Sequence, residues 1–106
     1  MKPVFRRAAA DQDVEGIIDY HLEKAGANVA LKFVDALQAA YARTARQPAA
    51  GSPRYAHELG IPGLRTWPLQ GFPYRIFYFE YADKVEVWRV LHEQRDIPTH
   101  LLEPDS

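Results

Sequence analysis

The spacing of the apolar residues changes halfway along the chain, and this change constrains the fold more than any other feature of the sequence. In the first half, apolar residues recur every three or four positions, which is the period of an amphipathic helix. In the second half they recur every second position, which is the period of a strand with one buried face. Two periods in separate halves are typical of an α+β domain whose helices pack on one face of a sheet.

Two helices, joined as an antiparallel hairpin, are expected in the first half. The first is predicted from about Ala9 to Ala25, where Gly26 would end it in a left-handed conformation. The second is predicted from Val29 to about Arg46, with Asn28 as its N-cap. The expected buried faces consist of Val14, Ile17, Ile18, His21 and Leu22 in the first helix and of Ala30, Phe33, Val34, Leu37, Tyr41 and Thr44 in the second.

The segment from 47 to 63 is predicted to be a loop, because it contains several residues that interrupt regular structure: Pro48, Gly51, Pro53, Pro62 and Gly63.

The helical hairpin is expected to cover one face of the sheet and to leave the other face open.

The second half predicts an antiparallel meander of three strands at 64–69, 74–81 and 84–92, with a tight turn at Ala82-Asp83. A further strand at 4–7 would join one side of the sheet, and a short helical turn would follow Pro98. In the last strand, alternation assigns one face to Val85, Val87, Arg89 and Leu91 and the other to Glu86, Trp88, Val90 and His92.

Composition narrows the function classes. The chain has 106 residues, which suits a single domain over residues 1–106, and it has no cysteine for a disulfide, a zinc ribbon or a thiolate nucleophile. Thirteen basic residues against fourteen acidic ones give a net charge of −1, so neither general coating of nucleic acid nor direct sequence-specific binding to it is expected. No apolar run approaches the roughly 18 residues of a membrane span. With no signal peptide, a cytoplasmic protein without membrane contact is expected.

Neither a metal nor a cofactor is expected. The spacing of the four histidines, His21, His57, His92 and His100, matches no metal-binding motif. The two serines, Ser52 and Ser106, do not lie on a strand-to-helix elbow, and the glycines do not form a phosphate-binding loop.

Four arginines are the strongest candidates for binding a partner. Arg65, Arg75 and Arg89 fall on three successive predicted strands, and Arg95 follows the last strand, near His92. Such a row could bind phosphate or carboxylate groups through bidentate hydrogen bonds. The alternative is that each arginine pairs with one of the nearby acids, Glu80, Asp83, Glu86 and Asp96. The aromatic residues between Trp67 and Trp88 similarly form either a stacking platform or part of the core, and the core is the more common role.

The order of these segments resembles a known family. Leu64-Arg65, Pro73–Tyr78, Val85–His92 and Arg95-Asp96-Ile97 resemble the carboxyl-terminal signature of ParE-like toxins in the RelE/ParE superfamily of type II toxin–antitoxin systems. The amino-terminal half is similar to the paired helices of that family, in Ala8-Ala9, Ile17–Tyr20, Ala30, Phe33 and Leu37. The resemblance therefore covers nearly the whole chain.

The resemblance implies a small α+β toxin that is neutralised by a cognate antitoxin, ParD-like or of another class, encoded by an adjacent gene. ParE members inhibit DNA gyrase, and plasmid stabilisation is associated with such systems. On this interpretation the toxin is non-enzymatic, and it would contact its target through Arg65, Arg75, Arg89, His92 and Arg95.

The resemblance also leaves an alternative, because RelE relatives cleave messenger RNA on the ribosome with basic residues and a terminal acid or base. A ribonuclease of this kind would use Arg65, Arg75, Arg95 and His100. The net charge of −1 lacks the positive field expected of a protein that docks on ribosomal RNA, and no tyrosine follows Arg95. Gyrase inhibition is therefore the favoured prediction.

Overall fold

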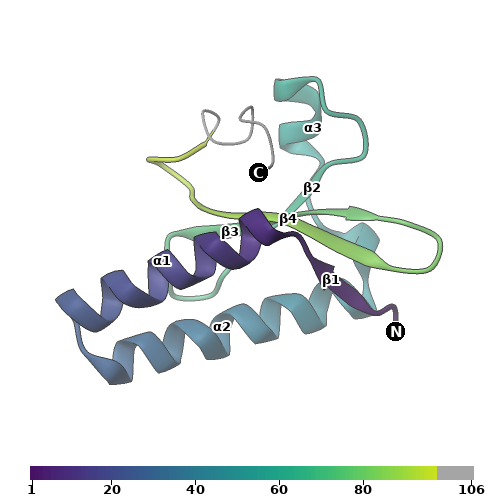
Figure 1. Cartoon of the computed structure of the whole chain (residues 1–106). Helices are drawn as coiled ribbons and strands as arrows, with labels where there is room; N and C mark the ends of the chain where they lie inside the picture. The colour runs from purple at the N-terminus through teal and green to yellow at the C-terminus, as the bar shows by residue number, and fades with distance from the viewer. Residues whose placement is uncertain (98–106) are drawn as a thin grey trace.

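The computed structural model describes residues 1–97, which form a helical hairpin, a four-stranded sheet and a short helix beyond the sheet (Figure 1). In chain order, the elements are β1 (Val4–Arg6), α1 (Ala8–Lys24), α2 (Ala27–Arg46), the 3₁₀ helix η1 (Pro48–Ala50), α3 (Arg54–Leu59), β2 (Arg65–Pro68), β3 (Tyr74–Glu80) and β4 (Val85–His92). The helical turn predicted after Pro98 lies outside the described residues.

The sheet has the strand order β1-β4-β3-β2. β2, β3 and β4 form the predicted antiparallel meander, and the Tyr81 N–H donates to the Lys84 carbonyl at 2.8 Å across the predicted turn. β1 pairs in parallel with β4, with Val4 opposite Val85. The sheet is therefore mixed rather than purely antiparallel.

The two predicted helices form the expected hairpin, but the cap of the second one is different. Gly26 has a φ of 94°, as its predicted role as a helix terminator requires. Gly26 is also the N-cap of α2, because its carbonyl accepts the N–H of Ala30 at 3.2 Å. The prediction that Asn28 is the cap was wrong, since α2 already begins at Ala27. Within residues 1–97, no helix combines the length and the apolar character needed to cross a membrane.

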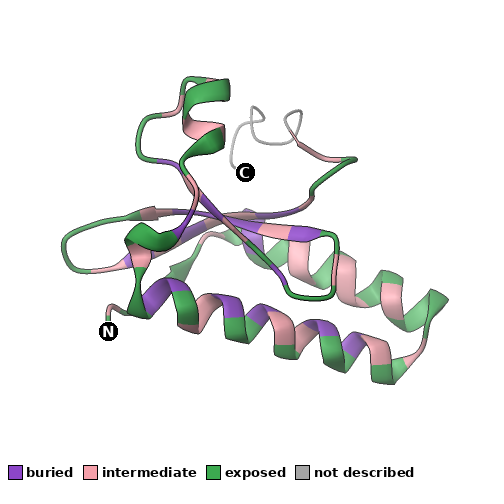
Figure 2. Ribbon diagram, turned by 180° about the vertical axis from the view of Figure 1, so that it is seen from behind, coloured by how far each residue is buried: buried purple, intermediate pink, exposed green. Residues whose placement is uncertain are grey.

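The main core lies between the hairpin and one face of the sheet. α2 presents a buried stripe to the sheet, visible in Figure 2 as alternating buried and exposed patches along the helix. Its Phe33 and Leu37 pack with Ile76, Tyr78 and Val87 of the central strands. The large aromatic side chains Phe33 and Tyr78 are fully buried, so the aromatic residues of this face serve the core.

The second face of the sheet is not left open, contrary to the expectation. Residues 47–63 contain η1 and α3, and α3 with the segment after it packs over this face. This second cluster consists of the buried Leu64, Phe77 and Leu91 with the partly buried Tyr55, Ala56, Leu59, Ile61, Phe79, Trp88 and Ile97. The loop prediction failed because the prolines begin these helices instead of breaking them. Pro48 is the first residue of η1 and Pro53 is the N-cap of α3, where a missing N–H costs nothing.

A β-bulge shifts the side chains of β4. Phe77 pairs with Arg89 while Tyr78 pairs with Val87, so Trp88 has no partner of its own on β3. The strict alternation predicted for this strand is therefore wrong beyond the bulge. Val90 packs in the main core and Leu91 packs on the α3 side of the sheet.

One carboxylate links α1 to the edge of β4. β1 covers that edge only as far as Val87, whose carbonyl accepts the Arg7 N–H at 3.0 Å. Beyond that point, Asp13 of α1 accepts two hydrogen bonds of 2.8 Å from the Arg89 guanidinium and one of 3.0 Å from the Val90 N–H. Both charged side chains are mostly buried, with exposed fractions of 13% for Arg89 and 14% for Asp13. The pair thus continues the edge pairing that β1 begins.

We expect Asp13→Asn to lower the free energy of unfolding by about 2–4 kcal/mol, because it removes the charged partner of a mostly buried guanidinium. Chemical denaturation followed by circular dichroism measures this change. Glu58→Gln is the control, since it breaks an exposed ion pair with Arg54 and should cost no more than about 1 kcal/mol. Equal losses in the two variants would contradict the role assigned to Asp13.

A second link joins η1 to β3. The Tyr78 hydroxyl donates to the Pro48 carbonyl at 2.6 Å, and Gly51 lies so close to the ring that a Cβ at this position would overlap the Tyr78 hydroxyl. We expect Gly51→Ala to destabilise the fold by about 1–3 kcal/mol, since the fully buried ring has no room to move. Gly16→Ala is the matched control, because nothing lies within 4 Å of that position in α1. This control should gain about 0.5–1 kcal/mol of helix propensity, and a loss as large as that of Gly51→Ala would contradict the argument.

Candidate functional site

The predicted row of arginines is divided among separate surroundings. The Arg65 guanidinium donates to the carbonyls of Ala49 and Gly51, at 3.2 and 2.8 Å, and so holds η1 against β2. The Arg75 guanidinium donates to the Thr66 hydroxyl at 3.1 Å and lies 3.5 Å from the Glu93 carboxylate. With Arg89 held by Asp13, all three have structural partners, although not the acids that the sequence suggested. Their role in target binding stays a prediction.

His92 and Arg95 lie together in the turn that follows β4. The His92 N–H donates to the Asp96 carboxylate and the Asp96 N–H donates to the His92 carbonyl, both at 3.1 Å. The His92 Nδ1 accepts the N–H groups of Gln94 and Arg95 at 3.2 and 3.3 Å. The Glu93 N–H donates to the Pro73 carbonyl at 3.0 Å. These bonds fix the backbone of the turn and leave the Arg95 side chain exposed.

The turn borders a hollow of about 380 Å³ that opens between α1 and the β3–β4 end of the sheet. We call it the Arg95 hollow; its lining residues are Tyr20, His21, Pro73, Tyr74, His92 and Arg95. A second hollow of about 300 Å³ shares Tyr20, Tyr74 and Arg95 and extends toward Asp13 and Asp96. Arg95 therefore stands where the two hollows meet.

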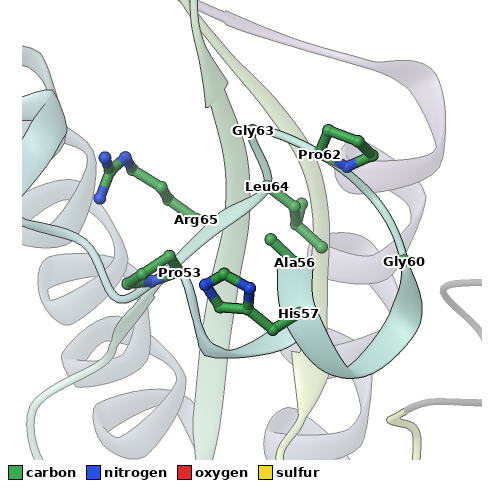
Figure 3. Close-up of a pocket in the computed structure, with 8 residues that line it drawn as sticks. All are labelled: Pro53, Ala56, His57, Gly60, Pro62, Gly63, Leu64 and Arg65. Atoms are coloured by element: carbon green, nitrogen blue, oxygen red, sulfur yellow. The ribbon is translucent and has the colours of Figure 1, made fainter.

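The histidines lie in different places. The His21 ring packs edge-on against Phe72 and Tyr74, and its buried Nε2 has no hydrogen-bond partner among residues 1–97. His57 is exposed on α3, where it lines another hollow of about 400 Å³ together with Leu64 and Pro62 (Figure 3). Figure 3 also shows the Arg65 guanidinium directed away from these two residues. His100 lies outside the described residues. In the described part of the chain, no cluster of three metal-ligating side chains occurs.

Of the six residues that line the Arg95 hollow, sequence reasoning named only His92 and Arg95 as site residues; the missed ones include Tyr20 and Tyr74. Tyr20 falls on the outer side of the predicted helix, where periodicity assigns no function, and it is 47% exposed. Tyr74 reads as an ordinary core residue of an aromatic strand. Only the tertiary arrangement shows that both border the same hollow as His92 and Arg95.

The buried tyrosines predict that the stability of the fold falls at high pH. Burial raises the pKa of Tyr41, Tyr74 and Tyr78 above the usual 10.0, although Arg95 opposes the shift at Tyr74. Because the pKa is higher in the folded state, these phenols stabilise the fold fully below about pH 10 and progressively less above it. We expect absorbance at 295 nm to show phenols that ionise only above pH 10, and Tyr41→Phe to reduce that amplitude. Ionisation of all phenols in one step near pH 10 would contradict this.

The comparisons with known proteins agree with this architecture. Residues 4–97 match the family described as the ParE toxin of the type II toxin–antitoxin system parDE. Among solved structures, the chain is similar to one from the chromosomal ParDE toxin–antitoxin system of P. aeruginosa, with a TM-score of 0.73 and 20% sequence identity. That alignment covers 87% of this chain and 96% of the other. At this identity the structural match shows a shared fold.

None of the curated proteins matches the chain. The family match, however, extends from β1 to the turn after β4 and so includes both the hairpin and the complete sheet. The chain belongs to the ParE family of toxins of type II toxin–antitoxin systems.

Proposed function

We propose that this toxin inhibits DNA gyrase, that it acts in the cytoplasm, and that a cognate antitoxin encoded by an adjacent gene neutralises it. The observation that carries the proposal is the match to the ParE family over residues 4–97. The fold supports it, since the chain shares its arrangement of helices and strands with a structure from a ParDE system.

Among the predicted contact residues, His92 and Arg95 are the best placed to touch the target. Arg95 is exposed, and His92 lies beside it at the border of the Arg95 hollow. Arg65, Arg75 and Arg89 are less available because their guanidinium groups hold η1, Thr66 and Asp13. Their proposed contribution is to keep the sheet and its covering elements in place.

The ribonuclease alternative receives less support from the site. Transfer of a phosphoryl group to a ribose hydroxyl needs an acid, a base and cations around a single phosphate. In the described residues, Arg65 and Arg75 are held by different partners and Arg95 borders a separate hollow. Three of the four residues named for ribonuclease action therefore show no common phosphate position.

A supercoiling assay with the purified toxin tests the proposal. We expect inhibition of gyrase, or accumulation of cleaved DNA, that is reversed by the antitoxin. Arg95→Gln should require about tenfold more toxin for the same inhibition, because it removes an exposed charged contact. Arg54→Gln removes an exposed arginine on α3 and should act like the unchanged protein.

Three outcomes are informative. Normal supercoiling in the presence of an excess of folded toxin would contradict gyrase inhibition. Translation-dependent cleavage of transcripts, with gyrase unaffected, would support the ribonuclease instead. Inhibition of gyrase by Arg95→Gln at the original concentration would remove Arg95 from the target contact while leaving the proposed function intact.

A further inference from the structure

The lining of the Arg95 hollow is unusual in its charge. Five of its six lining residues, all except Pro73, have a side chain with an N–H or O–H group, and none has a carboxylate. The nearby acids are directed elsewhere, because the Asp96 carboxylate accepts the His92 N–H and the Asp13 carboxylate binds Arg89. Arg95 forms no ion pair with any carboxylate within residues 1–97. Among residues 1–97, the lining of this hollow therefore presents donors and one exposed cation but no carboxylate.

The hydrogen bonds of the turn determine which nitrogen of His92 carries its proton. Two backbone N–H groups donate to Nδ1, so this atom is an acceptor and the ring proton of the neutral imidazole lies on Nε2. A proton on Nδ1 would break both bonds. The neutral His92 ring therefore offers its Nε2–H as a donor.

Tyr74 adds a hydroxyl donor. Arg95 and Tyr74 line the same hollow, and burial raises the pKa of the Tyr74 phenol although Arg95 lowers it. The hydroxyl thus keeps its proton at neutral pH and can donate it to an acceptor. Together with Arg95 and His92, it makes a set of three donor groups that includes one guanidinium.

A guanidinium beside further N–H and O–H donors matches a carboxylate. A carboxylate carries one negative charge and pairs with a guanidinium through two parallel hydrogen bonds. A phosphate monoester carries nearly two charges at neutral pH, of which the guanidinium alone neutralises one.

The surroundings of the hollow suit a carboxylate on a polypeptide. Tyr20, which lines it, is 47% exposed. An exposed aromatic side chain beside a polar hollow is typical of a protein interface. The ParE family supplies such a partner, because its toxins belong to systems that include an antitoxin.

We propose that the Arg95 hollow binds one acidic side chain of the antitoxin, held by Arg95, His92 and Tyr74, with Tyr20 covering its apolar stem. This inference rests on the proposed function, since it names how the neutralising partner is held. It also implies that the antitoxin covers the two residues proposed for target contact.

The first experiment uses small probes and the isolated toxin. We expect acetate to shift the NMR signals of the Arg95 side chain and of the His92 imidazole, whereas neutral acetamide should leave them unchanged. Inorganic phosphate is the comparison anion and should bind no more tightly than acetate. Arg95→Gln should abolish the acetate response. An acetate response that persists in Arg95→Gln, or that is absent from the unchanged protein, overturns the proposal.

The second experiment measures binding of the antitoxin encoded by the adjacent gene. Arg95→Gln should weaken the affinity by about tenfold to a hundredfold, while Arg54→Gln should change it by less than about twofold. Arg95→Lys keeps the charge but loses the bidentate geometry, so its affinity should lie between the two. Circular dichroism of each variant confirms that the fold is retained.

A double-mutant cycle then identifies the acidic side chain. Each Asp and Glu of the antitoxin is changed to Asn or Gln, and one change should weaken binding to the unchanged toxin but not to Arg95→Gln. If no acid couples to Arg95, the inference is wrong. The proposed function is judged separately, because gyrase inhibition and its reversal by the antitoxin can persist without this coupling.

Discussion

The structure depends on the carboxylate of Asp13 at the open edge of β4. β1 is only three residues long and covers β4 no further than Val87. Beyond it, Asp13 accepts hydrogen bonds both from the N–H of the buried Val90 and from the mostly buried guanidinium of Arg89. A helix side chain thus completes the edge of a sheet, and this fixes α1 relative to the strand that leads into the Arg95 hollow.

The β-bulge lies next to this contact. Arg89 binds Asp13 of α1, and it pairs with Phe77, which packs in the cluster under α3. Trp88 is the extra residue of the bulge. Beyond the bulge, Val90 lies in the main core and Leu91 on the opposite face. β4 thus contributes side chains to the clusters on both faces of the sheet, and its Arg89 forms the ion pair with Asp13.

The sequence predicted those parts of the fold that repeat with a regular period. Helix and strand periods located both helices and the meander to within a few residues, because a buried face imposes the same spacing throughout an element. Periodicity could not reveal α3, whose six residues are too few to show a period, nor the bulge, which interrupts the alternation by one residue. Part of the site could be predicted because His92 and Arg95 are close in sequence. Tyr20 joins them only through the packing of α1, which the sequence does not show.

Under our proposals, the antitoxin neutralises the toxin by competing with gyrase for the surface around the Arg95 hollow. If the antitoxin covers Arg95 and His92, the toxin cannot present them to gyrase at the same time, so the two partners compete for one surface. Competition needs no conformational change in the toxin, which agrees with a turn held by backbone hydrogen bonds and a sheet edge held by an ion pair. The fraction of active toxin then follows from the concentration of free antitoxin relative to its dissociation constant. Loss of antitoxin alone is enough to release an already folded toxin.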